Sequence, residues 1–256
     1  MTDDELIVRT DANYFAVWPL LCSLGDGGGE VIQRSGLTIT DSGTPLTQFN
    51  NIFVTRPLRD PLEKLRGAVA LFDDRRRPFV VRIREGLDSA ADRACEELGL
   101  VEGDVTPGMA LADMTKPGTR VDGLTILTAT SRETFLHHLD MIVGAFGVPR
   151  QFAEALLTDR FLHVPDAELY VGYLDHRPVA SSALFVTGRT AGVYNVATLP
   201  EVRGRGIGEA MTWHCVRRGA AIGCVAATLQ ASEMGRPIYE RMGFRLVSPY
   251  HTYHRP

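Results

Sequence analysis

A glycine-rich turn between a predicted strand and a predicted helix is the segment of this sequence best suited to chemistry. The turn spans residues 203–208, reads Arg-Gly-Arg-Gly-Ile-Gly, and follows the largely apolar stretch 194–199. Glycines allow a sharp turn whose backbone N–H groups converge on one anion, and the N-terminus of the following helix adds partial positive charge. The segment therefore predicts a binding site for a pyrophosphate group.

Two better-known phosphate-binding loops do not fit this turn. The dinucleotide fingerprint Gly-x-Gly-x-x-Gly requires a third glycine where this chain has Glu209 or Met211. A P-loop ends in Gly-Lys-Ser/Thr, and the turn contains no lysine. The pattern that remains is Arg203-x-x-Gly206-x-Gly208, and its plain structural alternative is a tight turn ahead of an ordinary helix.

This pattern resembles the acetyl-CoA motif of the GCN5-related N-acetyltransferase (GNAT) superfamily. The similarity continues before the turn through residues 196–201 and after it through residues 232–244, where Tyr-x-x-x-Gly-Phe resembles the end of the family's late helix. The two blocks occur in the family's order. The resemblance covers roughly residues 123–256 and favours a GNAT unit there over a merely structural turn.

The resemblance implies that acetyl-CoA is the cosubstrate and that no metal takes part. Backbone groups of the strand before the turn would contact the acetyl and pantetheine portion, and could polarise the thioester carbonyl. The turn would surround the pyrophosphate, and a serine in the later block corresponds to a family position beside the pantetheine arm. The implied contacts are Val196, Ala197, Thr198, Arg203, Gly204, Arg205, Gly206, Ile207, Gly208, Glu209 and Ser232.

Tyr239, in the later block, is the candidate general acid. Acetyl transfer to an amine expels CoA as a thiolate, which a phenol can protonate because their ordinary pKa values of about 10 and about 8.5 are close. The alternative is an aromatic ring that packs the helix on the sheet, and the two roles are compatible. The general base is not identified, since the strand offers Tyr194 and Asn195 and no carboxylate.

Other ionisable residues have ordinary structural explanations beside functional ones. We expect Glu168 and Glu201 to be solvated carboxylates rather than bases, and His214 to be a core histidine. One of His137 and His138 could contact the acceptor. Arg217 and Arg218 form a basic helix end that either faces solvent or meets the adenosine 3′-phosphate.

Hydrophobic periodicity and turn residues predict an α/β fold, with a mixed, mostly antiparallel α+β sheet flanked by helices. In the second half, Ser131 and Gly147 bound one predicted helix and Pro149 begins another. The other expected elements of that half are a hairpin over 168–174 and 179–186, strands at 192–199 and 224–229, helices at 206–220 and 237–242, and a closing hairpin over 244–253. In the first half they are strands at 51–55 and 79–83 and helices at 61–72 and 90–98.

The order of elements late in each half indicates an internal repeat. An offset of 144 residues superposes Gly99 on Gly243, and it also pairs Asn51 with Asn195 and Glu96 with Glu240. We therefore expect two GNAT-like units joined near 116–122, with residues 1–118 as a degenerate N-terminal unit and 123–256 as the catalytic unit. The first unit has no glycine in its corresponding turn, 56–61, and has Cys95 in place of the tyrosine. Chance similarity is the alternative.

Composition limits the partners. The formal charge of −4 gives no bulk attraction to nucleic acid or to an anionic membrane, and no apolar run reaches membrane-spanning length. The four cysteines lack metal-binding spacing, and the N-terminus is acidic where a signal peptide would be basic. We expect a cytoplasmic monomer or homodimer that binds an amine acceptor and neither nucleic acid nor membrane.

The sequence thus predicts an acetyl-CoA-dependent N-acetyltransferase acting on a primary amine, either a small molecule or a protein. Direct attack in a ternary complex is expected, because no cysteine in the matched segments could carry the acyl group. The main alternative is a catalytically inactive acyl-CoA-binding sensor or scaffold, favoured by the missing strand carboxylate. A nucleotide-binding regulatory domain is the third interpretation.

Overall fold

A computed structural model gives the fold of residues 1–116 and 118–256. Pro117, in the predicted linker, lies outside the described residues. The first half contains α1 (Asp3–Leu24), β1 (Glu30–Arg34), β2 (Leu37–Asp41), β3 (Asn51–Val54), α2 (Pro61–Asp74), β4 (Val80–Arg84), α3 (Ser89–Glu97), β5 (Val101–Glu102) and β6 (Thr106–Leu111). The second contains β7 (Leu124–Thr128), α4 (Arg132–Phe146), α5 (Arg150–Leu156), β8 (Ala167–Leu174), β9 (Arg177–Thr187), β10 (Thr190–Thr198), α6 (Ile207–Ala221), β11 (Ala226–Gln230), α7 (Arg236–Met242) and β12 (Arg245–His254).

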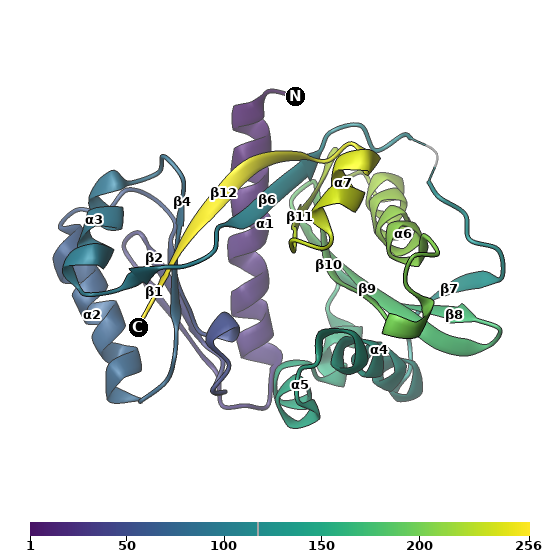
Figure 1. The fold of residues 1–256 in the computed structure, drawn as a ribbon, viewed down its shortest axis with the longest axis horizontal. Helices are drawn as coiled ribbons and strands as arrows, with labels where there is room; N and C mark the ends of the chain where they lie inside the picture. The colour runs from purple at the N-terminus through teal and green to yellow at the C-terminus, as the bar shows by residue number, and fades with distance from the viewer. Residues whose placement is uncertain (117) are drawn as a thin grey trace.

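One mixed sheet runs through both halves (Figure 1). Its strand order is β1-β2-β3-β4-β12-β6-β11-β10-β9-β8-β7, with β5 paired to β12 at the side. Among the strands that the structure describes, only the β3–β4 and β10–β11 pairs are parallel. This confirms the predicted α/β class with a mixed, mostly antiparallel sheet.

In the middle of the sheet, strands of the two halves are interleaved. Strand β6 pairs with β11 of the second half, from Gly108 opposite Gln230 to Leu111 opposite Ala227. Strand β12 pairs with β6 and then continues along β4 of the first half. The predicted closing hairpin at 244–253 is therefore wrong: that segment is one long strand, and β6 occupies the place of the missing hairpin strand. Hydrophobic alternation cannot distinguish the two arrangements, because it does not specify the neighbouring strand.

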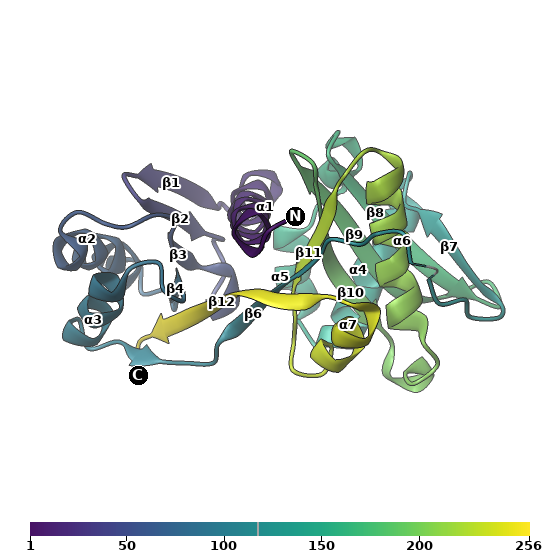
Figure 2. The same cartoon turned by 90° about the horizontal axis from the view of Figure 1, so that it is seen from above.

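Helix α1 lies across the centre of the sheet and contacts strands of both halves (Figure 2). A capping box between Thr2 and Glu5 starts it, and it continues through Pro19. Its buried Asn13 donates to the carbonyl of Phe185 at 2.9 Å and accepts from the Tyr194 hydroxyl at 2.7 Å. The sequence analysis did not predict this helix, which ties the N-terminus to β9 and β10.

Two helix ends have matching geometry at the predicted repeat offset. Gly99 after α3 and Gly243 after α7 both adopt left-handed conformations, with φ of 71° and 100°. The residue after each glycine donates to a carbonyl five residues earlier, Leu100 to Cys95 at 3.0 Å and Phe244 to Tyr239 at 2.9 Å. This shared geometry supports a repeat. The division into units 1–118 and 123–256 remains a prediction, and the sheet is continuous across it.

Helices cover both faces of the second half. Helices α6 and α7 pack on one face around Met211, Trp213 and Met242. Helix α4 packs on the other face through Phe135, Leu139 and Ile142. Its ends agree with the prediction, since Ser131 caps its N-terminus and Gly147 ends it in a left-handed turn. In the part of the chain that the structure describes, every helix is too short or too polar to cross a bilayer.

Candidate functional site

A pocket of about 810 Å³ lies where the C-terminal end of β10, the N-terminus of α6 and the helix α7 meet. Ten of the residues predicted for the site line it: Val196, Thr198, Arg203, Gly204, Gly206, Ile207, Gly208, Glu209, Ser232 and Tyr239. Ala197 and Arg205 do not line it, since Ala197 is buried in the sheet and Arg205 is exposed within the turn. The structure thus brings together the two sequence blocks that suggested the site.

The pocket opens because two neighbouring strands separate. Strands β10 and β11 pair only from Thr190 to Gly192 on the β10 side. Beyond that point β10 carries a bulge opposite β9, at which Asn195 adopts a φ of 51°. Bulges bend a strand and redirect its backbone groups. The bend leaves the end of β10 unpaired on its β11 side and gives a ligand access to its backbone.

The glycine-rich turn presents unpaired donors to this pocket. Gly204 and Gly206 have φ of 78° and 79°, which only glycine adopts without strain. Gly206 is the N-cap of α6 and no side chain caps that helix. Within residues 1–116 and 118–256, the N–H groups of residues 204–209 donate to no protein acceptor. Such a cluster at a helix N-terminus suits a diphosphate.

Two charged residues of the motif hold the turn in place. The Arg203 guanidinium donates to the carbonyls of Thr198 at 3.1 Å and Ala145 at 3.0 Å, which fastens the turn to the ends of β10 and α4. The Glu209 carboxylate accepts a hydrogen bond from the Thr119 hydroxyl. We conclude that both side chains position the turn, whatever contacts they add to a ligand.

Tyr239 lies on α7 facing the pocket, half-buried against Phe244 with ring centroids 5.9 Å apart. Burial raises the pKa of Tyr239 to about 12, so its phenol keeps the proton at neutral pH. The Ser232 hydroxyl accepts from the backbone N–H of Gly235 at 3.1 Å and so orders the turn into α7. Packing and proton donation are both available to this tyrosine.

The strand end and the glycine-rich turn of this site lie within residues that a known family model matches. Residues 111–230 match the family model described as the acetyltransferase (GNAT) domain. These residues form a GNAT domain.

Solved structures of GNAT proteins share the fold of the whole chain. A GCN5-related N-acetyltransferase from Kribbella flavida is similar with a TM-score of 0.70 and 17% identity, covering 94% of this chain and 96% of that one. One from Sphaerobacter thermophilus has a TM-score of 0.66 and 18% identity, over 89% of this chain and 76% of the other. A tandem GNAT protein from the clavulanic acid biosynthesis pathway has a TM-score of 0.63 and 14% identity, over 96% and 94%. No curated protein matches the sequence.

The GNAT fold supports acetyl transfer from acetyl-CoA in general terms. The pocket at the glycine-rich turn, which we call the glycine-turn pocket, also includes residues that the sequence analysis missed. These are Ala145, Phe146, Glu233, Met234, Gly235, Ile238 and Arg241. Those from 233 to 241 lie between Ser232 and the end of α7, so the motif itself could have indicated them. The end of α4 had no such signal, because only tertiary packing brings it to the turn. Among the described residues, no group of three or more His, Cys, Asp or Glu side chains could hold a metal.

The candidate bases and phosphate contacts outside the motif are engaged elsewhere. Glu168 accepts from Arg218 at 2.8 Å and from the Tyr170 hydroxyl at 2.7 Å. Burial by itself would raise the pKa of Glu168, but the hydrogen bonds from Arg218 and Tyr170 hold it below its ordinary value. This carboxylate is thus a structural ion-pair partner, and Arg218 is occupied. Glu201 is exposed and does not line the pocket.

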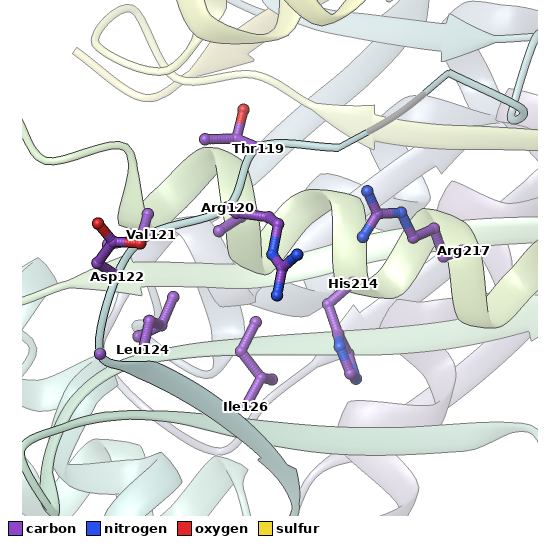
Figure 3. A pocket seen from close by; sticks show the side chains of 10 residues that line it. Thr119, Arg120, Val121, Asp122, Leu124, Ile126, His214 and Arg217 are labelled. Carbon is purple, nitrogen blue, oxygen red and sulfur yellow. The ribbon is translucent and has the colours of Figure 1, made fainter.

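His214 and Arg217 line a different pocket, of about 610 Å³, between α6 and residues 119–126 (Figure 3). The His214 ring meets Tyr170 edge-on at 4.5 Å between centroids, and burial lowers the pKa of His214. The expected core histidine is therefore half-buried at the margin of the sheet. Neither residue borders the pocket at the glycine-rich turn.

The two neighbouring histidines of α4 face different surroundings, and neither lines the glycine-turn pocket. His137 Nδ1 lies 2.9 Å from the Tyr173 hydroxyl. His138 is fully buried, its Nδ1–H donates to the Tyr170 carbonyl at 3.0 Å, and its Nε2 has no partner among the described residues. Burial lowers the pKa of His138 to about 4. His138 is thus a neutral core histidine.

This burial predicts a pH-dependent stability. The unfolded chain binds a proton at His138 near pH 6.5, whereas the folded protein resists it down to about pH 4. The free energy of unfolding is therefore highest above pH 6.5. Protonation of His138 in the unfolded chain lowers it by about 3 kcal/mol between pH 6.5 and pH 4. Urea unfolding at several pH values checks it. His138→Leu should flatten the decline and His137→Gln should not; equal slopes in all three proteins would refute the assignment.

Proposed function

We propose that the chain is an N-acetyltransferase that moves the acetyl group of acetyl-CoA to a primary amine. The observation that carries the proposal is the single pocket that joins the uncapped turn at residues 204–209, the bent end of β10 and Tyr239. The turn supplies donors for the pyrophosphate, and the strand end supplies backbone for the pantetheine arm and the thioester. Each part of acetyl-CoA thus has a fitting surface.

In the proposed reaction the amine nitrogen attacks the thioester carbonyl carbon in a ternary complex. A C–N bond forms, the C–S bond breaks, and CoA leaves as a thiolate. Backbone N–H groups near Val196 stabilise the oxyanion that develops during attack. The proton lost by the amine passes to solvent, because the carboxylates lining the pocket are Glu209, engaged with Thr119, and the exposed Glu233.

Tyr239 is the proposed donor to the thiolate. A pKa of about 12 keeps the phenol protonated until the thiolate appears. The same desolvated pocket raises the proton affinity of the departing sulfur, which reduces the difference between donor and acceptor. Transfer of this proton releases CoA as a neutral thiol, which is a poorer nucleophile than the thiolate toward the new amide.

Tyr239→Phe should therefore lower kcat by about 10²–10³-fold, the range of a lost acid catalyst, and leave the Kd for acetyl-CoA nearly unchanged. Phenylalanine keeps the ring that packs against Phe244, so the fold should be retained. Release of free CoA thiol measures turnover, and calorimetry measures binding. A variant with wild-type kcat would remove Tyr239 from the mechanism, and loss of binding without loss of kcat would make it a binding residue.

We propose one acetyl-CoA site per chain, in the second unit. In the first unit the turn 56–61 has no glycine, and the backbone N–H of Leu58 donates to the Asp88 carboxylate at 2.7 Å. A protein carboxylate thus lies where the second unit offers free donors, which supports a degenerate first unit.

A catalytically inactive acyl-CoA sensor is the second candidate, favoured by the lack of a buried carboxylate in the pocket. Thiol release from acetyl-CoA over a panel of primary amines, small molecules and lysine peptides, separates the two. The transferase releases thiol only with a suitable amine. Binding of acetyl-CoA without release across the panel would favour the sensor, and strong competition by ATP or NAD would favour a nucleotide-binding domain.

A further inference from the structure

A third pocket lies where β4 of the first half, β12 and the start of β6 meet. Its volume is about 480 Å³. Arg82 of β4, Thr106 of β6 and Thr252 and His254 of β12 contribute to its wall, together with Gln48 of the short 3-10 helix Thr47–Phe49. None of its lining residues borders the glycine-turn pocket. It is therefore a separate site candidate.

Arg82 is the unusual feature of this pocket. Its side chain comes from a central strand, and the residue is only 8% exposed. Its Nε donates to Asn51 Oδ1 at 2.8 Å and its Nη1 donates to the Thr106 hydroxyl at 2.9 Å. Both acceptors are neutral. In residues 1–116 and 118–256, no carboxylate forms an ion pair with this guanidinium.

One guanidinium nitrogen is left for a ligand. Nη2 of Arg82 has no hydrogen bond to any described residue, yet it is not among the fully enclosed polar atoms that lack partners. It therefore has accessible surface, and Arg82 lines the pocket. A buried cation without a counter-charge is costly, because desolvation of an ion is repaid only by an opposite charge or good hydrogen bonds. An anion at this position would supply both.

The surroundings specify the kind of anion. Hydroxyls of Thr106 and Thr252 and the amide of Gln48 are neutral polar groups, and the Asp104 carboxylate at the exposed rim disfavours a highly charged ligand. A carboxylate carries a single charge and matches the planar geometry of a guanidinium. We propose that this pocket binds a small carboxylate-bearing molecule, with its carboxylate on Arg82.

Occupancy of the site should stabilise the entire chain. The pocket is formed by β4 from the first half, by β12 from the second, and by β6, the strand between β12 and β11. A ligand that binds only when these strands are assembled favours the folded state by mass action. The binding is independent of acetyl-CoA, so its test does not depend on the proposed enzymatic activity.

Thermal unfolding and calorimetry of the full chain test the proposal, with succinate, acetate, glycine and inorganic phosphate as probes at constant ionic strength. We expect at least one carboxylate to raise the unfolding midpoint and to bind with one site per chain. Glycine against acetate reports whether Asp104 favours an additional ammonium group. Arg82→Gln should weaken carboxylate binding at least tenfold, whereas Arg93→Gln, on the exposed face of α3, should not.

A second variant keeps the test decisive if Arg82→Gln does not fold. Gln48→Glu places a negative charge at the exposed rim and should also weaken binding about tenfold, with Gln151→Glu on α5 as its matched control. Three results would overturn the proposal: no carboxylate binds, the two variants bind as the wild type does, or phosphate binds more tightly than every carboxylate.

Discussion

Replacing Gly208 by leucine is expected to weaken acetyl-CoA binding strongly while the protein stays folded. A Cβ atom at this position would lie 3.6 Å from Thr198 Oγ1 and 4.0 Å from Val196 Cγ1, so a longer side chain enters the pocket between turn and strand. The backbone of Gly208 is not in the left-handed region, so α6 accepts leucine there. Because the side chain covers several N–H donors, the Kd should rise on the order of 100-fold or more.

Ala221→Leu is the matched control for this variant. It places the same side chain at the exposed C-terminal end of α6, far from the turn. Calorimetry should show wild-type affinity for this control, and circular dichroism should show an intact fold for both variants. If Gly208→Leu binds acetyl-CoA as tightly as the control does, the pyrophosphate does not lie at this turn.

The two halves of the chain should unfold in a single transition, because β6 and β12 join them. Gly108 is at the centre of this exchange. A Cβ atom there would lie 2.4 Å from the Ser248 carbonyl oxygen and 2.8 Å from Tyr250 Cε2. Gly108→Ala must push β12 away from β6 and should destabilise the chain by about 3 kcal/mol.

The two tryptophans report on different regions of the chain. Trp18 lies on α1, beside Phe49 and Phe53 and against the core under α4, and Trp213 lies on α6 in the core of the second half. In each of the variants Trp18→Phe and Trp213→Phe, the fluorescence of the remaining tryptophan reports on one region. Its urea midpoint should equal the midpoint that circular dichroism gives for the same variant. Adding Gly108→Ala should lower both midpoints equally, and Gly67→Ala on the exposed face of α2 should not. Two separated transitions would contradict a sheet in which β6 and β12 join the two halves into one folding unit.

Local sequence signals predicted the elements of the second half well. Ser131, Gly147 and Gly243 begin or end helices through side-chain or left-handed caps, which operate over a few residues. The strand-turn-helix around Arg203 was predictable for the same reason, because its glycines specify both backbone and chemistry. Most of the residues in the glycine-turn pocket therefore came from the motif.

Features that depend on distant partners escaped prediction. Strand β12 has the alternation of a hairpin strand, but its neighbours, β4 and β6, come from residues more than a hundred positions earlier. Helix α1 contains Pro19, which in isolation argues against a helix, yet Asn13 and the aromatic cluster around Tyr14 fasten it to the sheet. The end of α4 joins the pocket through tertiary packing on β9 and β10, and Arg203 donates to the carbonyl of its Ala145. Each of these depends on tertiary contacts that no sequence window contains.

The most direct test of acetyl transfer follows the acetyl carbon itself. The protein is mixed with acetyl-CoA carrying ¹³C at the acetyl carbonyl, and NMR spectra are recorded with and without primary amines. The proposed function predicts that the thioester signal is converted into an amide signal only when a suitable amine is present, and that Tyr239→Phe slows the conversion. A thioester signal that persists across the amine panel, in a protein that binds acetyl-CoA, would contradict the transferase and support a sensor.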